Sequence, residues 1–507
     1  MSRNEAEVRA EKAEELRQAH INPYPSQSVP RTHTTQAVVE EFGDRLESGM
    51  VDPAGKVLTL CGRITAKRDS GNLVFLDLRD EFGRLQLKIE KKGVKEDSVL
   101  SFAQIKKLLD EGDFISAEGI ACRTNKGELS LQVERLSILA KAQIPFPDVY
   151  YGVHDVEVCR RHREMHLASN PAILQRFKLR SQIIFQIRSF LTERGFYEME
   201  TPILQAIYGG AAARPFVTHH NALDVDLYLR IAPELYLKRA ICGGFERVFE
   251  LGRVFRNEGI DSTHNPEFTS LEVYQAYADY IDILTLVEEV IIHAAKTVYT
   301  DISQIPYQGK TIDLTPSYEY NGQKHWRILT MTAAVKEYVG IDFDNIDLET
   351  ALAAVKAKGI HLSKLEEQSL GYLLYGVFDK CVAPQLEQPT FVIDFPVEVS
   401  PLAKQHRAKE GFVERFELFI QGMEYANGFS ELNDPQEQRR RFEQQLAQKY
   451  AGDEEAHPMD EDFIQALALG MPTCAGMGIG IDRLIMLLTD TASIRDVVMF
   501  PTMRPRQ

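Results

Sequence analysis

The chain lacks the cysteine pairs and the long apolar runs that define several protein classes. Its 507 residues include only six cysteines, and none of them forms a CxxC pair or a close cluster with histidine. We therefore expect buried thiols rather than a structural zinc site or a disulfide framework. No segment approaches the apolar length that spans a bilayer, and residues 1–20 are charged throughout, unlike a signal peptide. These features predict a cytoplasmic protein with no membrane partner.

An excess of positive charge is also lacking, because the formal net charge is −16. Nucleic-acid binding depends on where basic side chains cluster rather than on their sum, so this value excludes no partner. The hydrophobic content of 44% is enough to bury more than one core. The length predicts two or three domains.

The first third of the chain separates into three expected segments. Residues 1–52 form a charged helical extension with a Pro-containing loop, the pattern of a solvated appendage. Residues 53–142 contain five β-like runs with a helix after the third, which is the layout of an OB-fold barrel. Such a barrel often binds oligonucleotides, although a generic barrel that binds nothing has the same pattern. A linker is expected at 143–175.

The remaining residues, 176–507, alternate helical and strand patterns and include a stretch at about 281–390 that we expect to be mostly helical. The most informative segment is RVFELGRVFRNEGIDSTHNPEFTSLEVYQAYADY at 247–280, which is expected to form two strands joined by a polar loop. Residues two apart share a strand face, so Arg256 and Glu258 are predicted to project together from the first strand.

On the second strand, Phe268, Glu272 and Tyr274 are predicted to share a face in the same way. Arginine grips a phosphate bidentately, a phenyl ring stacks on a purine, and His264 in the loop could reach a triphosphate. A solvated face with a salt bridge is the alternative, but it accounts poorly for the aromatic rings.

A second group of polar residues lies at 414–434, where Asn427, Phe429 and Glu431 alternate onto one face. Glu417 and Glu424 flank a predicted tight turn at residues 421–422. A carboxylate pair near phosphates suits Mg²⁺, which binds one or two carboxylates together with substrate phosphates. Taken alone, the segment is more simply a surface hairpin with scattered acids.

A third pattern is GMGIGIDRLIMLL at 476–488. Gly478 and Gly480 would let the backbone approach a ligand closely, and Arg483 follows in the first turn of an apolar helix. The third glycine of a dinucleotide fingerprint is missing, and no βαβ unit surrounds the segment. An arginine at a glycine-rich turn suits a nucleotide phosphate better.

Together these segments resemble the signature motifs of class II aminoacyl-tRNA synthetases. GFYEMETPIL is similar to motif 1, FRNEG followed by HNPEFTSLE to motif 2, and GIGIDR to motif 3. From about residue 56 onward the chain resembles the lysyl-tRNA synthetase family, through strings such as GGAAARPF, YLRIAPELYLKR, NGFSELND and FPTMRP. The resemblance implies an α+β fold, with an N-terminal OB-fold barrel and a class II antiparallel sheet flanked by helices.

The resemblance also implies a homodimer that activates L-lysine with ATP and transfers it to the 3′ end of tRNA(Lys), with Mg²⁺ as cofactor. Neither step needs a covalent nucleophile. The implied ATP contacts are Arg256, Glu258, His264, Phe268 and Arg483, with Arg256 and Arg483 as the catalytic pair. The implied lysine contacts are Gly210, Glu234, Glu272, Tyr274, Asn427, Phe429 and Glu431. The implied metal ligands are Glu417 and Glu424, and the implied anticodon contacts are Arg68, Phe75 and Gln86.

Each alternative function conflicts with a different feature of the sequence. Aspartyl- and asparaginyl-tRNA synthetases share all three motifs, but an aspartate pocket needs a cation where this sequence has several acids. A relative that transfers lysine to a protein or lipid often lacks the anticodon domain or adds membrane segments. A non-catalytic RNA-binding relative commonly loses the active-site groups that are present here. Phe75 could also be plain barrel core.

Three departures from the family pattern affect specific expectations. Thr263 stands where many bacterial relatives carry arginine, which bears on contacts to ATP or the acceptor end. Met423 stands where relatives usually place a basic residue beside a metal ligand. The stretch EVCRRHREMHLASNP at 157–171 replaces the usual linker pattern and bears on the interface.

Overall fold

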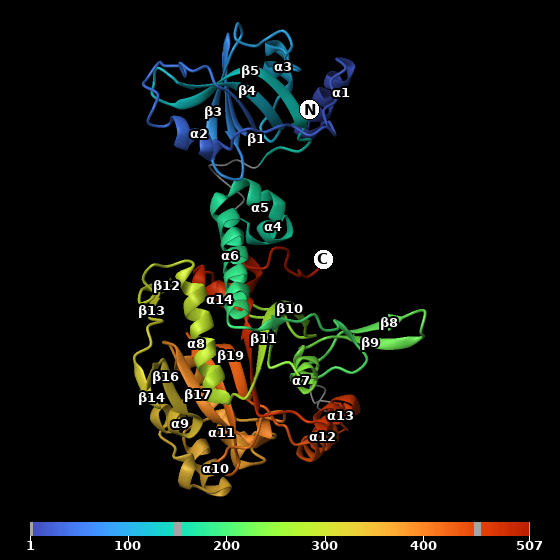
Figure 1. Ribbon diagram of the computed structural model, residues 1–507, viewed down its shortest axis with the longest axis vertical. Coiled ribbons are helices and arrows are strands. Elements are labelled where there is room, and N and C mark those ends of the chain that lie inside the picture. Colours follow the sequence, from blue (N-terminus) through green and yellow to red (C-terminus); the bar gives the residue numbers. More distant parts are fainter. Residues whose placement is uncertain (1–3, 147–154, 451–457, 506–507) are drawn as a thin grey trace. The chain divides into compact units, whose positions relative to one another are not determined.

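A computed structural model describes residues 4–146, 155–450 and 458–505. The chain divides into two compact units, Met1–Asn170 and Pro171–Gln507 (Figure 1). Part of the expected linker, 147–154, lies outside the described residues. No helix in the described part of the chain has the length and apolar character needed to cross a membrane.

The first unit contains the five-stranded barrel that the sequence predicted. Its strands close in the order β1-β2-β3-β5-β4, and helix α3 (Phe102–Leu108) follows the third strand. The strands are β1 (Val57–Ser70), β2 (Leu73–Arg79), β3 (Arg84–Glu90), β4 (Phe114–Arg123) and β5 (Leu129–Ala140). Val74, Leu76 and Leu78 alternate into the barrel core, because successive side chains of a strand point to opposite faces. The OB-fold layout is therefore confirmed.

The N-terminal extension is not the solvated appendage that its charge suggested. Helices α1 (Glu5–Gln18) and α2 (Thr35–Phe42) bury Leu16, Val38 and Phe42 in the barrel core. Arg9 donates a hydrogen bond of 2.8 Å to the carbonyl oxygen of Glu111. The apolar stripe of α1 is narrow, so the surrounding charges hid it. Helices α4 (Val156–Arg161) and α5 (Arg163–Ser169) complete this unit and contain most of the atypical 157–171 stretch.

The second unit is built on an eight-stranded sheet with the order β16-β17-β18-β19-β20-β11-β10-β6. All neighbouring strands are antiparallel except the outer pairs β16–β17 and β10–β6. The strands are β6 (Tyr197–Glu198), β10 (Arg247–Phe255), β11 (Glu267–Ala276), β16 (Arg327–Thr330), β17 (Thr390–Pro396), β18 (Phe412–Ile420), β19 (Met423–Ser430) and β20 (Cys474–Gly480). The predicted antiparallel sheet is confirmed.

One face of this sheet packs on the helices of the main core, and the other packs on further helices towards its two ends and carries polar groups between them. Helices α6 (Pro171–Glu193), α8 (Tyr280–Lys296) and α14 (Ile481–Leu488) supply the helical side chains of the main core (Figure 1). Leu271 and Val273 of β11 point into that core. Glu272 and Tyr274 therefore point to the opposite face, which we call the ligand face.

The stretch 281–390 is less helical than expected. Helices α9 (Met331–Val339), α10 (Leu348–Ala357) and α11 (Leu370–Cys381) are present. Before them, however, lie two hairpins and β16, so the prediction is wrong for 305–330. The hairpin strands are β12 (Ile305–Tyr307) with β13 (Lys310–Ile312), and β14 (Tyr318–Tyr320) with β15 (Gln323–His325). Gln308-Gly309 and Asn321-Gly322 both have positive φ, which suits two-residue hairpin turns.

The remaining elements complete the second unit, and the hairpin of β8 and β9 projects from it (Figure 1). A small sheet has the order β7-β9-β8, with β7 (Leu204–Gln205), β8 (Val217–His220) and β9 (Val225–Leu229). The other helices are α7 (Glu234–Cys242), α12 (Pro435–Tyr450) and α13 (Glu461–Leu469). Short 3₁₀ turns occur at Phe343–Asn345, Ala383–Gln385, Val397–Val399 and Ile494–Asp496.

Candidate active site

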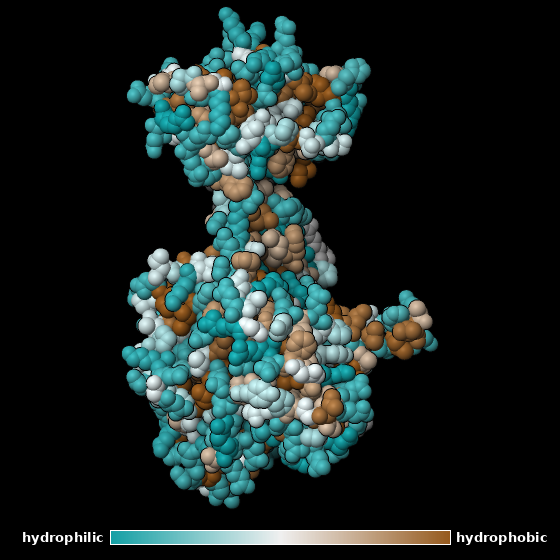
Figure 2. All heavy atoms as spheres, viewed as in Figure 1, coloured by the Kyte–Doolittle hydropathy of each residue, from teal (hydrophilic) through white to brown (hydrophobic). Residues whose placement is uncertain are grey.

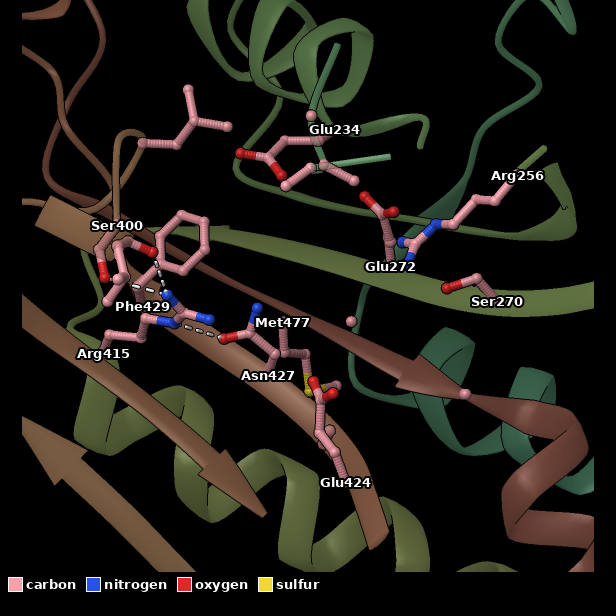
Figure 3. A pocket seen from close by; sticks show the side chains of 18 of the residues that line it. Glu234, Arg256, Ser270, Glu272, Ser400, Arg415, Glu424, Asn427, Phe429 and Met477 are labelled. Atoms are coloured by element: carbon pink, nitrogen blue, oxygen red, sulfur yellow. Dashed lines mark hydrogen bonds between the residues drawn. The ribbon is translucent and has the colours of Figure 1, made fainter. Parts of the chain in front are cut away.

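A cavity of about 680 Å³ lies on the ligand face of the sheet (Figure 3). This volume is in the range of small-molecule and cofactor sites. The cavity is lined by all the residues that the sequence assigned to ATP, lysine and metal except Glu417 and Glu431. These lining residues are Gly210, Glu234, Arg256, Glu258, His264, Phe268, Glu272, Tyr274, Glu424, Asn427, Phe429 and Arg483. The residues that the sequence motifs and the family resemblance singled out therefore lie mostly around one cavity.

Arg256 enters the cavity from a loop rather than from a strand. Strand β10 ends at Phe255, so the prediction that Arg256 and Glu258 share a strand face is wrong. The Arg256 amide donates to the Pro266 carbonyl at 2.9 Å, and a turn leaves Glu258 exposed. The Arg256 guanidinium lies 5.2 Å from the centre of the Phe268 ring. Its Nε is buried and has no hydrogen-bond partner among the described residues, as expected for a group that awaits a ligand.

Two further cationic or donor side chains converge near the same part of the cavity. Arg483 of α14 donates to the Glu424 carbonyl at 2.6 Å, and its other terminal nitrogen lies 3.3 Å from Nε2 of His264. Asp261 fixes His264 through contacts of 2.9 Å to Nδ1 and 2.7 Å to the backbone amide. The Thr263 hydroxyl also contacts Asp261, at 3.0 Å. We call Arg256, His264 and Arg483 the phosphate end.

The other part of the cavity is acidic, and we call Glu234, Glu272 and Tyr274 the acid end. The Tyr274 hydroxyl donates to Oε2 of Glu272 at 3.0 Å. Burial, together with the charge of Glu234, raises the pKa of Glu272 to about 8. Burial and the neighbouring carboxylates also raise the pKa of Tyr274 well above its usual range. Without a cationic ligand, Glu272 is therefore largely protonated at pH 7, while Tyr274 keeps its proton.

At the acid end, the wall of the cavity is formed partly by the backbone of two glycines. Gly210 has a φ of +89°, and a Cβ at this position would lie 2.8 Å from Cβ of Glu234. A Cβ at Gly476 would lie 2.4 Å from the Tyr274 ring and 2.6 Å from Oε1 of Glu431. Any side chain at these two positions would collide with the acidic residues. The two glycines therefore let the carboxylates stand close to the cavity.

Lys238 is a residue of this region that the sequence analysis missed. Its ammonium donates to Oε1 of Glu234 at 2.5 Å and forms an ion pair with Oε2 of Glu431. Glu431 is 1% exposed and is not among the residues that line the cavity, so its assigned contact with a ligand stays a prediction. The four-residue spacing between Glu234 and Lys238 on one helix was the available signal.

Arg415 of β18 was also missed, although it organises the side of the cavity opposite Glu234. It donates to Oδ1 of Asn427 at 3.1 Å and to the Ser400 hydroxyl at 2.9 Å (Figure 3). It also donates to Oε1 of Glu417 at 2.5 Å. A single guanidinium thus orients the amide assigned to a ligand carboxylate and one of the two carboxylates assigned to metal.

The carboxylates assigned to metal lie on neighbouring strands around a confirmed tight turn. Gln421 and Gly422 have φ values of 51° and 70° and connect β18 to β19. Glu424 faces the cavity, whereas burial and the charge of Glu424 raise the pKa of Glu417 to about 8 against the effect of Arg415. A divalent cation would stabilise both carboxylates as anions, so the pair fits Mg²⁺.

No larger metal-binding group competes with this pair in the part of the chain that the structure describes, where no three His, Cys, Asp or Glu side chains are grouped to hold an ion. An ion here would therefore depend on the carboxylate pair and on substrate phosphates. Met423 packs partly buried against the main core. The position therefore places no charge beside Glu424.

The three residues assigned to the anticodon lie on the barrel unit. Phe75 points away from the buried side chains of β2 and is half-buried, so plain barrel core does not explain it. The Arg68 guanidinium lies 5.9 Å from the Phe75 ring centre and donates to Asp77 at 3.3 Å. Gln86 accepts a hydrogen bond of 3.0 Å from Ser130. A ring, an arginine and an amide on paired strands suit a single-stranded base.

Comparison with known proteins agrees with this geometry. The family model described as tRNA synthetases class II (D, K and N) matches residues 155–504, and the OB-fold nucleic acid binding domain matches 58–139. A lysine–tRNA ligase of Trichormus variabilis is 50% identical over 98% of this chain and 87% of its own length. A lysine–tRNA ligase of Moorella thermoacetica is 49% identical over 99% of this chain and 98% of its own. The similarity therefore covers both units.

Proposed function

The chain belongs to the class II tRNA synthetases (D, K and N), and from that premise we propose that it is a lysine–tRNA ligase. The observation that carries the choice of amino acid is the acid end of the cavity. A ligand with two ammonium groups can enter a buried site only where carboxylates compensate for lost hydration. Glu234 and Glu272 supply such groups, and both are over 90% buried.

The cavity fits a lysine molecule whose two ammonium groups lie at the acid end and whose carboxylate faces the phosphate end. Glu234 and the backbone at Gly210 receive the α-ammonium, while Glu272 and Tyr274 receive the ε-ammonium together with Glu431 behind the Gly476 wall. Phe429 packs on the methylenes, and Asn427, held by Arg415, orients the carboxylate. The ligand carboxylate then points toward Arg256.

Activation joins the lysine carboxylate to ATP. A carboxylate oxygen attacks the α-phosphorus, a new O–P bond forms, and the bond to the departing pyrophosphate breaks. Arg256 stabilises the charge that develops on the α-phosphate, and Phe268 stacks on adenine beside Glu258. His264 and Arg483 hold the β- and γ-phosphates. The tRNA 3′-terminal hydroxyl then attacks the activated carbonyl, and AMP leaves. Positioning and charge stabilisation account for both steps.

Glu417 and Glu424 would hold Mg²⁺ at the edge of the phosphate end. The ion would neutralise charge on the phosphates of ATP. In its absence the two carboxyls repel each other, which contributes to the raised pKa of Glu417. Removal of divalent cations with EDTA is expected to abolish exchange, and added Mg²⁺ is expected to restore it.

An aspartate-specific enzyme is the nearest competing function, and the position of Lys238 bears on it. A cation does lie near the pocket, but it is 1% exposed, is engaged by two glutamates and does not line the cavity. It therefore cannot receive the side-chain carboxylate of an aspartate ligand. The acid end remains selective for ammonium groups.

ATP–pyrophosphate exchange with each of the twenty amino acids tests the proposal. Exchange with lysine alone, lost in Glu431→Gln, followed by poor charging of tRNA without the central anticodon uridine, is the expected result. Exchange with aspartate or asparagine, or no exchange with lysine, would overturn it. Glu337→Gln, which changes an exposed glutamate paired with Arg327, is the matched control.

We further infer that a second copy of this chain covers an apolar region around β6 and the β8–β9 hairpin. Large apolar side chains are exposed there, and Figure 2 shows brown apolar residues among teal polar ones along the projecting hairpin. They are Tyr197, Ile203, Leu204, Val217, Leu223, Val225 and Phe245. Exposed apolar patches of this kind mark interfaces, and motif 1 supplies β6. Sedimentation analysis is expected to give a dimer, and Tyr197→Glu is expected to shift it toward monomer; a wild-type monomer would contradict the inference.

A further inference from the structure

Lys238 lies directly behind the acid end, one turn of α7 after Glu234. Its side chain is almost completely withdrawn from water, and its ammonium contacts Glu234 and Glu431 at the same time. Because it does not line the cavity, it cannot touch a bound amino acid. A buried ammonium is costly unless it is paired, so its place between two carboxylates calls for an explanation beyond packing.

The surroundings of Lys238 contain several other ionisable groups, from four elements. Glu272 and Tyr274 belong to β11, Cys474 to β20 and Cys242 to α7, while Arg415 of β18 acts on Glu234. The Tyr274 and Phe429 rings lie 5.9 and 5.1 Å from the Lys238 ammonium. The immediate ion partners of Lys238 within the described residues are nevertheless the two glutamates.

The lysine and the glutamates control each other's charge. Burial disfavours the Lys238 ammonium, but the charges of Glu234 and Glu431 outweigh this effect and raise the pKa of Lys238 above its usual range. Burial raises the pKa of Glu234 and of Glu431, and the charge of Lys238 opposes both increases. Lys238 is therefore the group that favours ionised carboxylates at these two positions.

The charge that remains matches a particular ligand. Once a lysine ligand has displaced the proton of Glu272, the three carboxylates and the one resident ammonium carry two net negative charges, equal to the two ammonium groups of that ligand. Oε2 of Glu431 is engaged by Lys238, whereas Oε1 is buried beside Gly476 and has no hydrogen-bond partner among the described residues. The ion pair with Lys238 therefore leaves Oε1 of Glu431, the oxygen next to Gly476, without a cation.

We propose that Lys238 is a positioning residue that holds Glu234 and Glu431 ionised and aligned, so that the pocket accepts a ligand with two ammonium groups. This inference rests on the proposed lysine-activating function. It assigns to Lys238 no contact with lysine or ATP. Its effect is transmitted through the two glutamates, so it should appear in lysine binding and in the protons exchanged on binding.

Lys238→Met and the milder Lys238→Gln test the proposal in the full-length enzyme, with Lys336→Met as control. Lys336 is an exposed lysine of α9 paired with Asp342, remote from the cavity lining. We expect the KM for lysine at pH 7 to rise at least about ten-fold in both Lys238 variants, because one unit of carboxyl pKa changes the ionised fraction about ten-fold. The KM for ATP is expected to change less than about two-fold, since the phosphate end is untouched.

Proton release provides a readout that a purely structural role would not change. Calorimetry of lysine binding in buffers of different ionisation enthalpy gives the number of protons released per ligand. We expect about one more proton from Lys238→Met than from wild type, and a steeper gain in lysine affinity as the pH rises from 6.5 to 9. Lys336→Met is expected to behave as wild type.

Each alternative outcome is informative. Unchanged lysine KM and unchanged proton release in folded Lys238 variants would overturn the proposal, and so would an equal loss for lysine and ATP with the wild-type pH profile. Lys238→Gln retains length and a hydrogen-bond donor, so failure of both variants to fold would assign Lys238 a structural role instead. Absence of lysine exchange in wild type would overturn the proposed function itself, which separates the two failures.

Discussion

Charged groups at the acid end are buried from bulk solvent, whereas the arginines on the barrel are largely exposed. Glu234, Glu272 and Lys238 are over 90% buried. On the barrel, by contrast, the side chains of Arg68 and Arg84 are 58% and 49% exposed around Asp77. Coulomb interactions are strong in a low dielectric and weak in screened solvent. A single charge should therefore matter greatly in the cavity and little on the barrel.

The difference also separates two kinds of recognition. The cavity selects a small ligand by the number and position of buried charges, and these respond to pH. The barrel face offers a half-buried ring beside exposed cations, which suits stacking on a base and steering of a phosphate backbone. Variants in the two regions should therefore change different steps of one overall reaction, with effects that decrease from the cavity to the barrel.

The largest expected effect is that of Arg256→Ala. The Arg256 guanidinium lies 5.2 Å from the centre of the Phe268 ring, and its buried Nε has no hydrogen-bond partner among the described residues. Its loss should therefore remove stabilisation of the α-phosphate. We expect kcat for ATP–pyrophosphate exchange to fall about 10²- to 10³-fold, as for removal of one preorganised donor. The control is Arg327→Ala, which removes an exposed guanidinium paired with Glu337. A change confined to the KM for ATP would contradict the assigned role.

The pH dependence of lysine binding comes next. Because the pKa of Glu272 is raised to about 8, the carboxyl is protonated below that pH, and lysine binding must expel the proton. The apparent affinity for lysine should therefore fall about ten-fold for each pH unit between 8 and 6. Glu272→Gln should raise the KM for lysine and flatten this profile. A flat profile in wild type would show that Glu272 is already ionised.

The same group links pH to the stability of the ligand-free enzyme. The folded-state pKa of Glu272 lies above the ordinary glutamate value of 4.5, so the folded state holds the proton more tightly than the unfolded state. The stabilisation is complete below about pH 4.5 and is lost as the pH rises toward 8. Glu272→Gln should accordingly raise Tm relative to wild type at pH 8 and change it less at pH 5.

On the barrel, Phe75→Ala should weaken only the recognition of tRNA. Loss of one base–aromatic stack costs about 1–3 kcal/mol, which corresponds to an increase of about 5- to 160-fold in the KM for tRNA. Exchange of ATP with pyrophosphate should remain at the wild-type rate, because that step needs no anticodon. Phe82→Ala, which removes an exposed ring from the β2–β3 loop, provides a comparison for loss of apolar surface. Equal charging defects in the two variants would argue against a specific role for Phe75.

Much of both regions could be predicted from the sequence, because the decisive patterns are local. Period-two alternation placed Phe268, Glu272 and Tyr274 on one face of β11, whereas Phe75 was assigned only through the family resemblance. Local patterns failed at Arg256, where the chain leaves the strand and enters a loop. The end of β10 depends on contacts across that loop, such as the hydrogen bond from the Arg256 amide to the Pro266 carbonyl. The Asn321-Gly322 hairpin is different, because its signal was present and was outweighed by nearby helical periodicity.

The pairing of Lys238 with Glu431 could not be predicted from spacing. It depends on the packing of α7 against β10 and β11, which buries Leu237 and Ile241 with Tyr274 and Cys474. Only this tertiary contact brings Lys238 beside a carboxylate that follows β19. The same packing explains why Glu431, although it alternates with Phe429, is withheld from the cavity lining. Burial of charge is a property of packed elements and is weakly encoded in any one of them.

The smallest expected effect comes from Arg84→Gln on the barrel, and it sharpens the comparison with Lys238→Gln. Both substitutions remove a cation that contacts two carboxylates: Asp77 and Glu128 for Arg84, and Glu234 and Glu431 for Lys238. The Arg84 side chain is half exposed, and the buried Asp77 keeps its contact with Arg68 when Arg84 is replaced. The free energy of unfolding should therefore change by less than about 1 kcal/mol, and the change should shrink further in high salt. Removing Lys238 leaves two buried carboxylates without their cation. The free energy of unfolding should therefore fall several-fold more than in the Arg84 variant, and this loss should not depend on salt. Denaturant unfolding of both variants at low and high salt measures the contrast directly. Similar losses of stability would mean that water reaches the acid end, and the argument from burial would then fail for the cavity.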